Sequence, residues 1–109
     1  MAEFHTERRR NEIQNSAAKF FGERSNRRSL ITVTRADLSQ DRKTILLGIS
    51  VLPTSQETAA LDFAKRNMGE LRQYIGKMTR IGNVPYLSVE LDSGEKNRQR
   101  IDELLQADN

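Results

Sequence analysis

The chain contains no cysteine and only one histidine, His5, among its 109 residues. Without cysteine it cannot form disulfides or thiolate metal sites, and this composition suits a reducing compartment. A single histidine cannot supply the Ser-His-Asp or Cys-His groupings of nucleophilic enzymes, nor a metal site of His and Cys ligands. The composition therefore argues against an enzyme and predicts no cofactor.

Oxygen-ligand metal sites and phosphate-binding loops are also missing from the sequence. The carboxylates Asp37, Asp41, Glu90 and Asp92 lack the close spacing of a calcium-binding loop. The one passage from a predicted strand into a helix, VLPTSQET, contains no glycine and so cannot be a glycine-rich phosphate loop. What remains is a protein that acts through its surface.

Long apolar runs are absent, and aromatic residues are few. No run approaches the roughly 20 residues that span a bilayer. The first residues lack the apolar centre of a secretory signal, and Glu3, Glu7 and Glu12 argue against a transit peptide. With 36% hydrophobic and 6% aromatic residues, we expect one domain over residues 1–109 with a largely aliphatic core, located in the cytoplasm and away from membranes.

The charge is unevenly distributed along the chain, whose formal net charge is +3 and whose pI is near 9.6. Residues 1–80 carry 15 Lys and Arg and 9 Asp and Glu, a net charge of +6. Residues 81–109 carry 3 Lys and Arg and 6 Asp and Glu, a net charge of −3. A basic body with an acidic end is typical of a polyanion-binding protein, although a chance imbalance in a highly charged domain is the simpler alternative.

Apolar spacing predicts a first helix over residues 3–22, with Gly22 as its C-terminal cap. Its apolar side consists of Ile13, Ala17, Phe20 and Phe21. Residues 23–28, ERSNRR, are too polar for a core element and are predicted to form a basic loop. Arg27 and Arg28 in this loop could extend the basic face that is predicted below for residues 54–80.

Two strands are predicted next, over residues 29–38 and 43–52, joined by a polar turn into an antiparallel hairpin. In the first strand Ile31 and Val33 are expected on one face, with Thr32, Thr34 and Ala36 on the other. In the second, Ile45, Leu47, Ile49 and Val51 share a face.

Residues 54–80 have a helical pattern in which Thr54 and Glu57 fit a capping box. The apolar stripe consists of Leu61, Ala64, Met68, Leu71, Ile75 and Met78. The opposite side carries Lys65, Arg66, Arg72, Lys77 and Arg80, with Gly69 and Gly76 among them. Because an interior glycine costs a helix about 1 kcal/mol, two of them indicate a kink or a close approach to the backbone.

A last strand, residues 86–91, is expected with Leu87, Val89 and Leu91 inward. Residues 93–109 form a charged tail with a possible short helix over residues 100–105. The element order is α-β-β-α-kink-α-β, an α+β fold with a three-stranded mixed sheet and helices on one face. The simplest topology puts the third strand beside the first and parallel to it.

A basic helix face of this kind can bind a phosphate backbone by charge and counterion release. The alternative is an ordinary solvated face, on which Lys and Arg occur because they favour helices. Glycines on such a face favour the binding interpretation, because positions without a side chain let a sugar-phosphate chain approach the helix backbone. Tyr74 next to the band could stack on a base or equally pack in the core.

The element order α-β-β-α-kink-α-β resembles that of a type II KH domain and, more closely, that of the ribosome-binding factor A family. Three segments carry the resemblance: ITVTRADLSQDRKTILLGISVL, RNMGELRQYIGKMTRIGNVPYLSVELD and RQRIDELL. The Gly-x-x-Gly loop of typical KH domains is absent, and the resembled family has an Ala-x-Gly kink instead. Here that position holds Asn67, Met68 and Gly69, of which the glycine matches and the asparagine can support a helix break.

The resemblance implies a non-catalytic RNA-binding assembly factor for late maturation of the small (30S) ribosomal subunit and 16S rRNA processing. The implied partner is 16S rRNA near the neck region and 5′ helix, bound by a protein that is monomeric when free. The RNA-binding residues would be Lys65, Arg66, Gly69, Arg72, Lys77 and Arg80, extended by Arg27 and Arg28. The alternative is a protein-interaction adaptor that uses an exposed sheet edge and the acidic tail.

Overall fold

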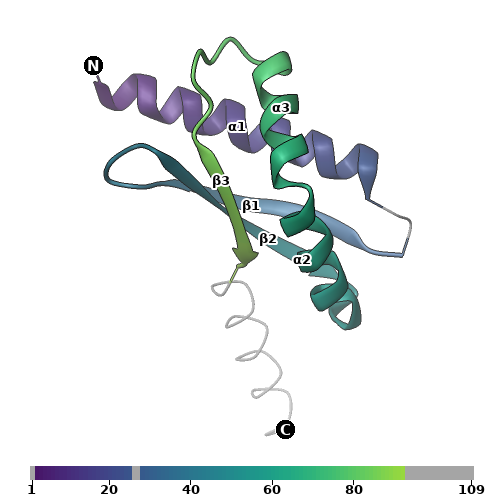
Figure 1. Ribbon diagram of the computed structural model, residues 1–109. Helices are drawn as coiled ribbons and strands as arrows, with labels where there is room; N and C mark the ends of the chain where they lie inside the picture. Colours follow the sequence, from purple (N-terminus) through teal and green to yellow (C-terminus); the bar gives the residue numbers. More distant parts are fainter. Residues whose placement is uncertain (1, 26–27, 93–109) are drawn as a thin grey trace, which may run out of the picture.

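A computed structural model describes residues 2–25 and 28–92 and confirms the α+β fold with the predicted element order. The elements in Figure 1 are α1 (Ala2–Arg24), β1 (Leu30–Leu38), β2 (Thr44–Leu52), a 3₁₀ turn (Thr54–Gln56), α2 (Glu57–Arg66), α3 (Met68–Met78) and β3 (Tyr86–Leu91). The helix predicted over residues 100–105 falls outside the described residues, as does Arg27.

The sheet has the strand order β1-β2-β3, with β1 antiparallel and β3 parallel to β2. The prediction that the third strand lies beside the first is therefore wrong. The crossover through α2 and α3 returns the chain to the edge of β2 that the hairpin leaves open. This topology places β2, the most apolar strand, at the centre of the sheet, where its residues from Ile45 to Val51 are covered best.

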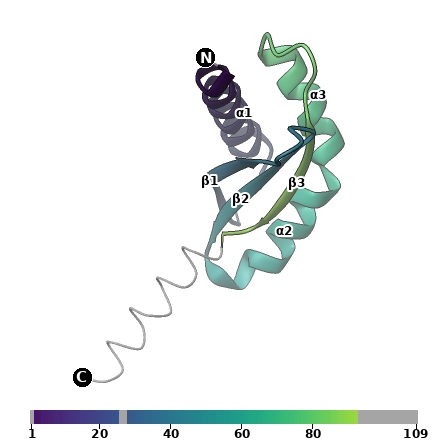
Figure 2. The same cartoon turned by 90° about the vertical axis from the view of Figure 1, so that its left-hand side faces the viewer.

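All three helices pack on one face of the sheet, as predicted, and Figure 2 shows the opposite face uncovered by any described element. The side chains between the two layers form one apolar cluster. Its largest fully buried members are Phe20, Phe21, Ile13, Ile45, Leu47, Ile49, Leu71 and Ile75. On β3, Val89 is buried while Leu87 and Leu91 pack against the cluster, which confirms the inward face predicted for this strand.

Helix α1 buries all four of its predicted apolar residues completely. The helix continues to Arg24, so Gly22 is a helical residue and not the cap that was predicted. Arg24 closes the end of α1 by stacking 4.8 Å from the Phe20 ring centroid and pairing with Glu70 of α3 at 3.4 Å. The ion pair links the C-terminal end of α1 to α3.

The alternation of β1 changes phase at a β-bulge, which the sequence pattern did not predict. Val33 pairs with Ile49 and Arg35 pairs with Gly48, so Thr34 is the extra residue. The extra residue moves Ala36 to the core face, where it is 3% exposed, against the prediction that it faces away. The bulge also sends Arg35 to the open face, where it forms ion pairs with Asp37, Glu90 and Asp92; these four residues are the Arg35 cluster.

The long helix is interrupted at Asn67, the first of the three residues Asn67, Met68 and Gly69 at which the kink was predicted, so the break lies two residues before the glycine. Asn67 has φ −104° and ψ 11°, outside the helical range, and its Nδ2 donates to the Phe63 carbonyl at 2.7 Å. This side chain-to-backbone bond supports the break in the way expected for asparagine. Gly69 is the second residue of α3, and a Cβ added there would meet nothing within 4 Å.

Two further details of residues 54–80 differ from the predictions. Thr54 begins the 3₁₀ turn and accepts the Glu57 N–H through its backbone carbonyl, so α2 starts without the predicted capping box. Met78 at the end of α3 is 58% exposed and lies outside the apolar stripe. The other five stripe residues are buried or pack against the core cluster, as predicted.

Candidate nucleic-acid interface

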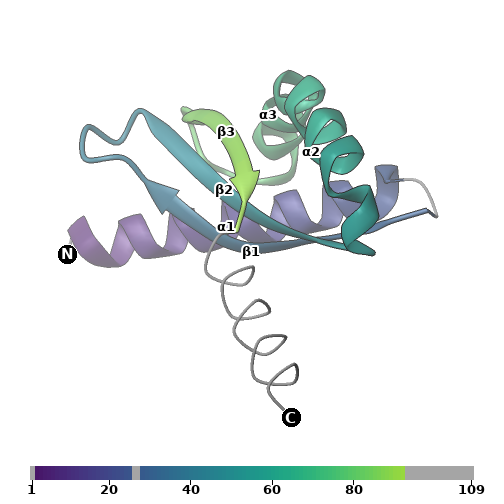
Figure 3. The same cartoon turned by 90° about the horizontal axis from the view of Figure 1, so that it is seen from below.

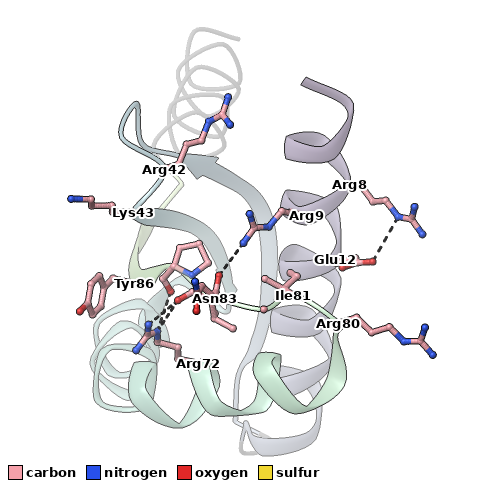
Figure 4. Close-up of a pocket in the computed structure, with 13 residues that line it drawn as sticks. Arg8, Arg9, Glu12, Arg42, Lys43, Arg72, Arg80, Ile81, Asn83 and Tyr86 are labelled. Atoms are coloured by element: carbon pink, nitrogen blue, oxygen red, sulfur yellow. Dashed lines mark hydrogen bonds and ion pairs between the residues drawn. The ribbon is translucent and has the colours of Figure 1, made fainter. Parts of the chain in front are cut away.

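A groove of ≈ 870 Å³ lies where α1, the β1–β2 turn and the α3–β3 loop meet. Figure 4 shows its side chains around the α3–β3 loop. It is lined by Arg8, Arg9, Glu12, Arg42, Lys43, Arg72, Arg80, Ile81, Gly82, Asn83, Val84, Pro85 and Tyr86. Six of these are cationic and one is acidic, so we refer to it as the cationic groove.

The groove is assembled from segments that are distant in the sequence. In Figure 3 the N-terminal half of α1 and the β1–β2 turn lie at the same end of the molecule. The Nη2 of Arg9 donates to the Asn83 carbonyl at 2.9 Å, which ties α1 to the loop before β3. The Glu12 carboxylate lies 3.9 Å from the Arg8 guanidinium, an exposed pairing that offsets little of the positive charge.

The β1–β2 turn holds Arg42 and Lys43 at the rim. Arg42 has a φ of 62°, the left-handed conformation, and its N–H donates to the Ser39 carbonyl at 2.9 Å. The Asp41 carboxylate accepts hydrogen bonds from the Ser39 hydroxyl at 2.6 Å and from the Lys43 N–H at 3.0 Å. These bonds, the Ser39 hydroxyl first, lower the pKa of Asp41, so its charged form stabilises the turn.

Arg72 connects α3 to the loop before β3. Its Nη2 and Nε donate to the Val84 carbonyl at 2.8 and 3.1 Å, and Nε also lies 3.3 Å from the Pro85 carbonyl. Its guanidinium carbon is 4.7 Å from the centroid of the Tyr86 ring. Arg72 therefore has a structural role in holding the loop, in addition to the positive charge that the sequence assigned to it.

The structure divides the predicted RNA-binding residues between two places. Arg72 and Arg80 line the cationic groove, and Gly69 lines a smaller adjoining hollow with Arg72, Gln73 and Asn83. The remaining described members, Lys65, Arg66, Lys77 and Arg28, do not line the groove; the first three are exposed on α2 and α3. The predicted band is thus a surface that reaches the groove only at its α3 end.

Four groove cations were not singled out from the sequence: Arg8, Arg9, Arg42 and Lys43. Arg8 and Arg9 lie within the first predicted helix, Arg42 in the predicted polar turn and Lys43 at the start of the second predicted strand. The sequence signal was the concentration of positive charge before residue 80. Their meeting depends on how α1 crosses the sheet, which periodicity alone does not encode.

Two residues left open by the sequence are decided by their contacts. Tyr74 is a core residue, 9% exposed, with its ring centroid 5.5 Å from that of Phe20 at an interplanar angle of 62°. Its packing role excludes stacking on a base. A Cβ added at Gly76 would lie 3.8 Å from Val84 Cγ2, so its near neighbour is a side chain at ordinary contact distance.

Among residues 2–25 and 28–92, no three His, Cys, Asp or Glu side chains are grouped closely enough to hold a metal ion. No helix within the same ranges has the length and apolar character needed to cross a membrane. In the part of the chain that the structure describes, the cationic groove is therefore the feature with the clearest binding chemistry.

Residues 5–105 match the family model described as ribosome-binding factor A. The chain belongs to the ribosome-binding factor A family. A ribosome-binding factor A from Clostridium botulinum (strain Okra / Type B1) is 27% identical over 78 residues, and one from Beutenbergia cavernae is 34% identical over 83 residues. These matches cover 71% and 72% of the chain, but only 65% and 50% of the two relatives' own lengths.

Solved structures of ribosome-binding factor A share this fold. The crystal structure of the protein from Thermus thermophilus superposes with a TM-score of 0.67 at 19% identity, covering 77% of this chain and 92% of that one. A homology model of the Thermus thermophilus protein, fitted into a cryo-EM map of its complex with the 30S subunit, gives a TM-score of 0.66 at 19% identity. It covers 75% of this chain and 89% of that one.

Proposed function

We propose that this chain is a ribosome-binding factor that binds the small ribosomal subunit and assists its maturation without catalysing a reaction. The family membership supports the role, and the Thermus relative described with the 30S subunit supports the partner. The single observation that carries the mode of binding is the cationic groove, where six Lys and Arg side chains surround one open cavity.

The groove suits RNA because its charges come from three segments held in fixed positions. Arg9 and Arg72 are hydrogen-bonded to the α3–β3 loop, and the β1–β2 turn that carries Arg42 is closed by its own hydrogen bonds. Cations arranged in advance bind a phosphate backbone by counterion release without losing much side-chain freedom. Shape and phosphate contacts, rather than base edges, would then give the selectivity.

The finer points of the proposal follow the family resemblance. The target is 16S rRNA at the neck region and the 5′ helix, and the outcome is correct processing of 16S rRNA. The protein acts as a cytoplasmic monomer with a single domain. Lys65, Arg66, Lys77 and Arg28 extend the binding surface beyond the groove along α2, α3 and the loop after α1.

The test is co-sedimentation of purified variants with immature small subunits. Arg80→Glu with Lys43→Glu reverses two exposed groove charges whose side chains are not used to hold the loop. Lys65→Glu with Arg66→Glu reverses two charges outside the groove, and Lys19→Glu is the control on the exposed side of α1. We expect loss of binding for the groove pair, weaker binding for the α2 pair and no change for Lys19→Glu.

Arg72 is unsuitable for this test, because replacing it would release the Val84 and Pro85 carbonyls as well as remove a charge. If the folded groove pair sediments with subunits as the unmodified protein does, the groove is not the RNA-binding surface. A protein-interaction adaptor would also differ in its salt response, since its binding would not fall by orders of magnitude with moderate salt.

A further inference from the structure

We propose that Tyr86 is a stacking platform for an unpaired RNA base at one wall of the cationic groove. This inference rests on the proposed function and narrows its ligand to a single-stranded stretch of RNA. It is carried by the exposure of the Tyr86 ring, by the arginine that stacks on it, and by the hydrogen bonds that hold the Tyr86 backbone and the Arg72 side chain.

Tyr86 keeps its ring in solvent although its backbone is fixed. The residue is 65% exposed, more than the other exposed large apolar residues of the described chain, Leu30, Leu52 and Met78. Its N–H donates to the Lys43 carbonyl at 2.8 Å, and it pairs with Thr44 at the start of the parallel ladder. Core packing therefore does not account for an aromatic residue here, whereas a binding surface does.

Arg72 completes the platform. Its guanidinium carbon lies 4.7 Å from the centroid of the Tyr86 ring, while its Nη2 and Nε are held by the Val84 carbonyl. The arginine takes one face of the ring and leaves the ring's remaining surface open to solvent. A base stacking on that surface would meet a ring that is already oriented, so little ordering remains to oppose binding.

The surrounding charges select the form of the nucleic acid. Lys43 and Arg42 lie on the β1–β2 turn, with Lys43 the nearer of the two to Tyr86, and Arg80 lies farther along the groove wall (Figure 4). Phosphates on either side of a stacked nucleotide can contact these cations. A base in a duplex is enclosed by its neighbours and cannot reach the ring, so the site distinguishes single strands from duplexes.

The chain itself supplies a reporter for this contact. It has no tryptophan and two tyrosines, of which Tyr74 is buried in the core. Tyrosine emission of the full-length protein should therefore fall when a short oligouridylate stacks on Tyr86. The same strand annealed to oligoadenylate, and an abasic strand of equal length, should bind through charge with little change in emission.

Three variants separate stacking from charge. Tyr86→Leu should weaken oligouridylate binding by about tenfold and abolish the emission change, since one stacked base is worth roughly that factor. Tyr86→Phe should restore the affinity, because the ring and not the hydroxyl makes the contact. Leu52→Ala, at an exposed apolar residue at the opposite end of the sheet, should leave affinity and emission unchanged.

Equal affinities for Tyr86→Leu and the unmodified protein, with no emission change on binding single strands, would overturn the platform. If that same Tyr86→Leu protein still sediments with small subunits, the proposed function stands without it. If the unmodified protein binds neither the oligonucleotide nor the subunit, the proposed function fails first. Thermal unfolding of each variant identifies any loss of binding that comes from misfolding.

Discussion

Arg35 is the residue around which the open face of the sheet is arranged. Its Nε lies 2.9 Å from Asp37 Oδ2 and its Nη1 lies 3.4 Å from Asp92 Oδ1, while Nη2 pairs with Glu90. The side chain crosses β2 above Gly48 and so joins β1 to β3, which are not neighbours in the sheet. Glycine is required below it, because a Cβ at position 48 would lie 2.7 Å from Arg35 Cγ.

Gly48→Ala should therefore lower the free energy of unfolding by about 1–3 kcal/mol, as overpacking usually does. Arg35 must move away from Glu90 and Asp92 to admit the new methyl group. Urea denaturation measures the change. In an Arg35→Ala background the same substitution should cost much less, since the obstruction is gone. Gly22→Ala, in open space on α1, should instead stabilise the protein by about 1 kcal/mol.

Asp41 gives a second prediction at the scale of single residues. Its pKa is lowered from the ordinary value of 3.8 by the Ser39 hydroxyl and the Lys43 N–H. A depressed folded-state pKa means that the stabilisation is complete above the unfolded value and is lost as the pH falls through the folded one. An NMR titration should find the pKa of Asp41 below 3.8, and Ser39→Ala should move it back toward that value. An unchanged titration in Ser39→Ala would contradict the assignment.

Among the helices and strands, the apolar spacing was sufficient to predict which elements form. The stripe on α1 and five of the six residues in the stripe on α2–α3 were predicted correctly, because a helix face shows in the sequence as repeating positions; Met78 was the exception. The bulge at Thr34 could not be predicted in this way, since one extra residue leaves a pattern that still looks alternating. The place of β3 beside β2 depends on which sheet edge the crossover reaches, a property of three elements together.

The break at Asn67 belongs to this scale as well. Asn67→Ala removes the Nδ2 bond to the Phe63 carbonyl and leaves a better helix former at the junction. We expect α2 and α3 to become more nearly continuous, with a rise in helical circular dichroism, and binding to small subunits to weaken. Gly69→Ala is the matched control, because nothing lies within 4 Å of the added methyl group and the break remains. Equal effects of the two substitutions would mean that the helix break depends on Gly69 as much as on Asn67.

At the scale of the whole molecule, the sequence predicted a basic surface but not its shape. Arg72 and Arg80 were recognised because the predicted helix over residues 54–80 put both on one face, although α3 ends at Met78 and Arg80 lies in the loop after it. Arg8 and Arg42 were not, because the distance between them in the sequence hides that α1 and the β1–β2 turn meet at one end of the molecule. A groove built from three segments is a product of topology, and a single sequence contains no direct signal for it.

The groove also predicts a salt dependence that can be measured residue by residue. Each phosphate contact to single-stranded RNA contributes about −0.7 to the slope of log K against log salt concentration. Arg80→Ala should therefore make the slope less steep by about that amount, and Lys19→Ala should leave it unchanged. Filter binding of oligouridylate over a range of salt concentrations is the measurement. An unchanged slope for Arg80→Ala would show that Arg80 does not contact a phosphate of the bound RNA.

The Arg35 cluster makes the open face of the sheet unfavourable for a phosphate chain. It combines one guanidinium with three carboxylates, so its formal net charge is −2. Along β3, the same face of the sheet passes from Tyr86 beside Arg72 to Glu90 beside Arg35, a distance of about 13 Å at the usual rise of a strand. A phosphate chain that continued from the groove along this face would meet carboxylates. On the proposed function, the cluster would repel a phosphate chain on this face and leave the surfaces of α1 and α3 as the more favourable route.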